Sequence, residues 1–143
     1  MIRENAYTAL FSLLKGLKTA GKVKTCDRRV RFLEEMGVSE LPALFMSVSN
    51  QQTAQIRGLP PRHTLQAKIY LYASNPDRHT PAGVQLNGLL DAIEQTLTPA
   101  ATEDALSLGG QVSHAWIEGP VEVFEGPQGE RAAAVLSIHM LVP

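Results

Sequence analysis

The sequence predicts an α/β fold of the α+β kind, with a mostly antiparallel four- to five-stranded sheet and two helices packed on one face. Two segments carry apolar residues at helical spacing. Two others, 63–73 and 132–142, alternate apolar and polar residues, as half-buried strands do. The length of 143 residues suits one domain with one core, residues 1–143.

The first helix is expected over residues 2–18, and Gly21 marks its end. Its apolar stripe consists of Ile2, Ala6, Leu10, Leu13, Leu14 and Leu17. Residues 23–26 are expected to form a short strand. Residues 28–35 are charged and fit either a helical turn or a strand edge.

A long polar arm, residues 49–62, separates two strands expected at 41–48 and 63–73. This order predicts an antiparallel hairpin with an oversized loop. The Pro60-Pro61 pair limits the entropy that the arm loses on ordering. We therefore expect the arm to contact a partner, and the alternative is a flexible loop without one.

The second helix is expected to begin with Thr80 as N-cap and Pro81 at the first helical position. Residues 111–124 are interpreted as one long bent strand, kinked at Gly119 and Pro120. A glycine within a strand indicates a bulge or bend, and proline restricts its site to an edge.

The net charge is only -1, but the charges are unevenly distributed along the chain. Between Lys15 and Arg31 there are seven basic residues and one acid, and between His79 and Glu130 there are eight acids and no lysine or arginine. The pattern fits two solvated faces of opposite sign. It also fits a heterologous contact between copies that closes into a ring, or a basic face for nucleic acid.

A nucleic-acid-binding face would combine the basic residues with aromatic side chains. Tyr70 and Tyr72 share one strand face with Lys68, which suits stacking on bases, although packing against a helix or a neighbour is the alternative. The lysines that could face DNA are Lys15, Lys18, Lys22 and Lys24. We favour an inter-subunit role for the basic cluster over a nucleic-acid-binding one.

The sequence contains no recognisable catalytic or cofactor-binding motif, so we expect no enzyme, cofactor or metal. The four histidines lack metal-ligand spacing, although His114 and His139 lie on strands expected to pair. Cys26 is the single cysteine, which agrees with a reducing compartment. No apolar run is long enough for a membrane span, and no signal peptide is visible, so we expect the chain to stay in the cytoplasm where it is made.

Several segments together, in their order, resemble a known family. They are "MIRENAYTALFSLL", "LPALFM", "GLPPRHTLQAKIYLYA", "LLDAIEQTL", "LGGQVSHAWIEGPVEVFEG" and "IHMLVP". The set is similar to the lambda-type tail terminator and minor tail proteins of long-tailed bacteriophages, over nearly the whole chain. The resemblance implies an α/β fold with two helices against a mostly antiparallel sheet.

The resemblance also implies a virion structural protein at the head-proximal end of the tail. Such a protein forms a homohexameric ring on the tail tube protein, stops tube polymerisation and offers a docking surface to the head-completion or connector protein. Genomic DNA would pass through the lumen without specific binding. The alternatives are a head–tail joining or tail-completion protein and a small nucleic-acid-binding module.

These expectations assign interface roles to particular residues. Arm residues would contact a neighbouring subunit or the tube, and charged residues of opposite sign would meet between subunits. The arm residues are Gln51, Gln52, Gln55 and Arg57. The charged residues are Arg28 and Arg29 on one side and Glu118 and Glu122 on the other.

Overall fold

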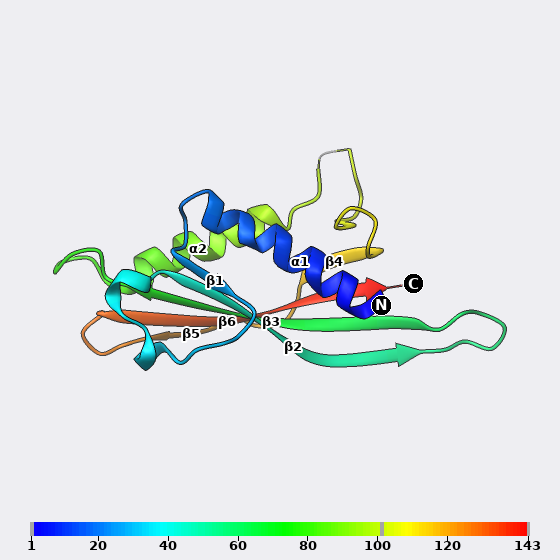
Figure 1. Ribbon diagram of the computed structural model, residues 1–143, viewed down its shortest axis with the longest axis horizontal. Coiled ribbons are helices and arrows are strands. Elements are labelled where there is room, and N and C mark those ends of the chain that lie inside the picture. The colour runs from blue at the N-terminus through cyan, green and yellow to red at the C-terminus, as the bar shows by residue number, and fades with distance from the viewer. Residues whose placement is uncertain (1, 101, 143) are drawn as a thin grey trace.

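Two helices cover one face of a six-stranded mixed sheet in the computed structural model, which describes residues 2–100 and 102–142 (Figure 1). In chain order the elements are α1 (Ile2–Thr19), β1 (Thr25–Asp27), two 3₁₀ turns η1 (Leu33–Glu35) and η2 (Val38–Glu40), β2 (Ala43–Ala54), β3 (Arg62–Ser74), α2 (Ala82–Thr96), β4 (His114–Ile117), β5 (Glu122–Glu125) and β6 (Arg131–Val142). The predicted α+β class is therefore confirmed.

The strand order is β1-β2-β3-β6-β4, and β5 also pairs with β6. All pairs are antiparallel except β1 with β2, which run parallel. The sheet thus has more strands than the predicted four or five and is mixed. Parallel neighbours need a crossover rather than a tight turn, and residues 28–42 supply it.

Helix α1 forms because a stripe of apolar side chains can be buried against the sheet. Its buried residues are Ala6, Tyr7, Leu10, Leu14 and Leu17. Gly21 ends it as predicted, with φ of 77° and a bond from the Lys22 amide to the Leu17 carbonyl of 2.9 Å. This is the Schellman arrangement that a glycine after a helix permits.

Helix α2 begins one position later than predicted, with Pro81 as N-cap. Thr80 does not cap it, because its amide and hydroxyl both bond to the carboxylate of Asp77 in the preceding turn. The first turn instead receives Glu125 from β5, whose carboxylate accepts a 3.0 Å bond from the Gly83 amide. A carboxylate at this end also suits the helix dipole.

Strands β3 and β6 form the centre of the core. Their pairing runs from His63 with Val142 to Ser74 with Arg131. The predicted apolar faces are confirmed as buried, with Leu65, Ala67, Ile69 and Leu71 on β3 and Ala134, Leu136, Ile138, Met140 and Val142 on β6. Both helices pack on these side chains, so one face of the sheet makes the main core.

The opposite face of the sheet is covered at one end only, by the crossover. A second cluster there consists of Met36, Leu41, Ala43, Phe45 and Tyr72. The Tyr72 hydroxyl donates a 2.7 Å bond to the Arg31 carbonyl, which holds the crossover on the sheet. The remainder of this face is half-exposed and carries no helix.

The predicted bent strand is divided into β4 and β5, which follow one another along the same edge of β6. Ile117 pairs with Ile138 and Glu122 pairs with Val135, so residues 118–121 oppose only residues 136–137. Gly119 lies within this break with φ of 84°. The bend was thus predicted at the right place, but it interrupts the strand.

Burial of α1 can be tested by replacing a leucine with alanine at a buried site and at an exposed one. Leu10 is 0% exposed in the core, whereas Leu59 in the arm is 57% exposed. We expect Leu10→Ala to lower the free energy of unfolding by about 3 kcal/mol, because it leaves a cavity. Leu59→Ala should change it by less than about 0.5 kcal/mol. Urea unfolding followed by circular dichroism measures both, and equal losses would contradict this fold.

Candidate interaction surfaces

The arm is a projecting β-hairpin rather than a long loop. Strand β2 continues to Ala54 and β3 begins at Arg62, so only residues 55–61 are outside the ladder. Figure 1 shows this hairpin extending beyond the rest of the sheet. The predicted antiparallel hairpin is confirmed, but its loop is shorter than predicted, because the backbone groups of polar residues on both strands continue the ladder beyond the core.

A β-bulge sets the direction of the arm. Val48 pairs with Ala67 and Gln51 pairs with Leu65, so residues 49–50 oppose Gln66 alone. Such a bulge bends the strand and increases its twist. It also fixes which side chains of β2 face α1 beyond this point.

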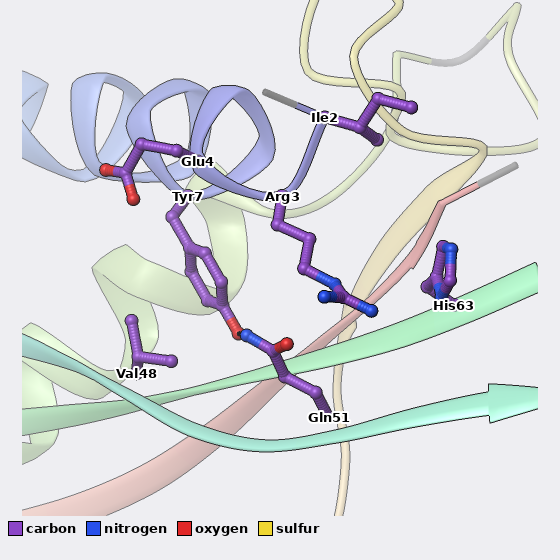
Figure 2. Close-up of a pocket in the computed structure, with 7 residues that line it drawn as sticks. All are labelled: Ile2, Arg3, Glu4, Tyr7, Val48, Gln51 and His63. Carbon is purple, nitrogen blue, oxygen red and sulfur yellow. Dashed lines mark hydrogen bonds between the residues drawn. The ribbon is translucent and has the colours of Figure 1, made fainter.

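Side chains of α1 hold the base of the arm. The Tyr7 hydroxyl donates a 3.1 Å bond to the Gln66 carbonyl. It also accepts a 3.3 Å bond from the side-chain amide of Gln51, which lies beside it in Figure 2. Burial raises the pKa of Tyr7, although its two hydrogen bonds and nearby arginines oppose the shift. Gln51, predicted as an interface residue, is therefore bound within its own chain.

An open groove lies beside this contact, between the start of α1 and the base of the arm. Figure 2 shows the seven residues that line it, namely Ile2, Arg3, Glu4, Tyr7, Val48, Gln51 and His63. Ile2 is 60% exposed, although the helical stripe predicted it in the core. The groove lies at the bulge, since Val48 and Gln51 on its two sides both line it.

The arm is polar along its strands but apolar at its tip. Ile56 is 67% exposed and Leu59 57% exposed, and both line a groove with Pro60 and Pro61. Because most residues of the arm are polar, the sequence did not lead us to predict these exposed apolar side chains at its tip. The other predicted residues here, Gln52, Gln55 and Arg57, are all exposed.

The basic cluster is partly satisfied within the chain. Arg28 forms an ion pair with Glu4 and lies over the Tyr7 ring, and Arg31 pairs with Glu40 at 2.6 Å. The side chain of Arg28 is thus held by a contact within its own chain, and its interface role stays a prediction. Arg29 is exposed, and only its backbone amide bonds to Asp27.

The four lysines assigned to a DNA-facing surface are all exposed. Lys15 and Lys18 line a shallow depression at the C-terminal end of α1, and Lys22 and Lys24 follow in the connection to β1. The structure gathers them at one end of a helix, as helix-dipole electrostatics favour.

Of the two predicted acidic interface residues, one has side-chain partners within the chain and the other has none among the described residues. Glu118 accepts a 2.8 Å bond from the Trp116 indole and lies 3.8 Å from His139. Glu122 is exposed on β5, and no hydrogen bond or ion pair holds its side chain among the described residues. Glu122 is therefore the acid available to a partner.

Strand β5 is an exposed edge that sequence reasoning missed. All four of its residues are exposed, including Val123 at 56% and Phe124 at 62%. Val121 before it is 37% exposed. The sequence signal for this edge was the apolar pair Val123 and Phe124 between Glu122 and Glu125, shortly after Gly119 and Pro120.

The predicted aromatic platform for bases is contradicted for Tyr72. Its side chain is 7% exposed and packs on Phe45, with ring centroids 5.6 Å apart. The aromatic group of this face is elsewhere, where His114 and His139 both stack with Trp116. In the ladder His139 pairs with Trp116, and His114 pairs with Leu141.

Within residues 2–100 and 102–142, no three His, Cys, Asp or Glu side chains lie close enough together to hold a metal ion. Over the same residues, neither helix has the length and apolar character to cross a membrane. No protein-family model matches the sequence, and no curated protein is significantly similar to it. Function must therefore be argued from the exposed surfaces.

The difference between Arg28 and Arg29 predicts a selective pKa effect. The hydrogen bond from Arg28 holds the pKa of Glu4 below its usual 4.5. A lowered pKa stabilises the fold above about pH 4.5, and this contribution is lost as the pH falls through the folded value. We expect Arg28→Gln to raise the pKa of Glu4 toward 4.5 and Arg29→Gln to leave it unchanged.

A carbon-13 NMR titration of the Glu4 carboxyl group measures this difference directly. The Arg29→Gln variant is the matched control, since it removes the same charge one residue away. Equal pKa changes in the two variants would show that Arg28 does not form the specific contact.

Proposed function

We propose that this chain is a phage tail terminator, a non-enzymatic virion protein that forms a homohexameric ring on the tail tube. The ring stops tube polymerisation and provides the docking surface for the head. The observation that carries the proposal is the projecting arm with its exposed apolar tip. The order of sequence segments that resembles tail terminators supports it as well.

The arm has the physical properties of an interaction device. A two-stranded hairpin without a covering layer is only marginally stable in water. Exposed apolar groups such as Ile56 and Leu59 add a further cost. A partner that covers the tip removes both costs, and the bulge and Tyr7 orient the arm before binding, which lowers the entropy of docking.

The location of the surfaces is compatible with a ring. The arm projects at one end of the sheet, and β5 lies toward the other (Figure 1). Complementary surfaces at different places on one chain allow head-to-tail contacts, which close into rings when the rotation permits. The uncovered part of the second sheet face remains available to the tube protein or to the head.

The DNA-binding alternative loses support, because Tyr72 is buried and cannot stack on bases. The exposed lysines at the end of α1 fit a weaker role, in which they face the DNA that passes through the ring. Contacts to phosphate alone carry no sequence preference, so passage would not depend on sequence.

A tube-assembly experiment tests the proposal. The tail tube protein of the same phage is polymerised with and without this chain, and tube lengths are measured by negative-stain electron microscopy. We expect the chain to limit tube length and to occupy one tube end. Unchanged lengths and bare ends would contradict the terminator role.

An arm variant identifies the part that acts. Replacing residues 55–61 with Asn-Gly keeps the pairing of Ala54 with Arg62 and supplies a tight hairpin turn. We expect this variant to fold and to lose tube capping. Val84→Ala, which removes an apolar group that is 59% exposed on α2, is the control and should cap normally. Normal capping by the shortened arm would show that the arm is not needed.

A further inference from the structure

Strand β5 leaves backbone groups unpaired at the edge of the sheet. Among the described residues it pairs only with β6, and the Gly126 amide bonds to the Arg131 carbonyl at 2.9 Å. Because hydrogen-bonded and non-hydrogen-bonded pairs alternate in an antiparallel ladder, the backbone groups of Val123 and Glu125 point away from β6. An edge of this kind can accept another chain.

The side chains of β5 combine apolar groups with charges. Val123 pairs with buried Ala134 and so faces the helix side, whereas Phe124 pairs with Ala133 and faces the opposite side. Both are more than half exposed. Native edge strands are usually short, charged or covered, and β5 is short and carries Glu122 and Glu125, but it also has an exposed apolar group on each face. A partner that grips this strand would therefore bury apolar area on either side.

The tip of the arm complements β5 in both charge and polarity. The tip carries Arg57 and Arg62, and residues 41–76 contain no acid. The segment that contains β5, residues 79–130, has no lysine or arginine, and Glu122 is exposed without a partner among the described residues. The next residue, Arg131 on β6, lies beside β5, and its guanidinium donates a 2.8 Å bond to the Leu33 carbonyl. Each surface thus presents apolar groups beside charges of one sign, and the two signs are opposite.

We infer that the tip of the arm of one copy docks on β5 of the next copy. In this contact Ile56 and Leu59 cover Phe124, and Arg57 pairs with Glu122. The arm cannot reach β5 of its own chain, because the two lie toward opposite ends of the sheet (Figure 1). The inference rests on the ring of the proposed function and names the surfaces that close it.

Two complementary variants test the contact. One carries Ile56→Ser with Leu59→Ser in the arm, and the other carries Val123→Ser with Phe124→Ser in β5. All four side chains are exposed, so we expect both variants to fold. Loss of two central apolar contacts should weaken self-association by about 30-fold. A mixture of the two variants retains one intact arm and one intact β5, so it should give 1:1 heterodimers.

Native mass spectrometry measures these species, and Val84→Ser is the control that should assemble as the wild type does. Rings that persist in both variants would overturn the inference and leave the terminator role standing, with other surfaces closing the ring. A mixture that gives no heterodimers would also overturn it.

If the wild-type chain is monomeric in the absence of the tube, disulfide trapping can still detect the contact between two copies. Leu59→Cys in one chain and Phe124→Cys in another, both with Cys26→Ala, should form mixed disulfides in preference to homodimers. Failure of this preference would overturn the inference. Mixed disulfides together with unchanged tube lengths would support the contact but contradict the proposed function.

Discussion

The structure depends on burial of one face of the β3–β6 pair. Every second residue from Ala132 to Val142 is buried, and the helices cover that face alone. At about 25 cal/mol per Å² of apolar surface, this layer supplies the main stabilisation of the fold. Because burial of this one face stabilises the fold, no covering layer is required on the arm, on the β5 edge or on the second face beyond the crossover.

Helix α1 connects this core to the parts that project from it. Its buried side binds the sheet, while Tyr7 bonds to the base of the arm and Glu4 bonds to Arg28 before the crossover. A displacement of α1 would therefore loosen both the arm and the crossover. The proposed junction is pre-oriented by these contacts, so that less conformational entropy is lost when copies meet.

The sequence was sufficient for elements whose apolar pattern decides their structure. Leu65 to Leu71 and Ala134 to Val142 were predicted on buried faces, because strict alternation fits only a half-buried strand. The start of α2 was misplaced by one residue, since local turn chemistry at Asp77 competed for Thr80.

The surfaces were harder to predict than the core. Backbone pairing of Gln51 to Ala54 with β3 requires no apolar pattern, so the sequence did not show how far the paired strands continue into the arm. Arg28 and Arg29 are adjacent arginines that the sequence does not distinguish. Only the tertiary structure shows that Arg28 forms an ion pair with Glu4. The exposed edge at Val123 and Phe124 was missed because apolar residues in a strand segment usually indicate a core.

The central claim is that copies of this chain close into a ring of six. The mass of the assembly, measured by native mass spectrometry on the chain alone and bound to tube ends, tests it most directly. The account predicts a hexamer in at least the tube-bound sample. A chain that stays monomeric or dimeric in both samples would contradict it.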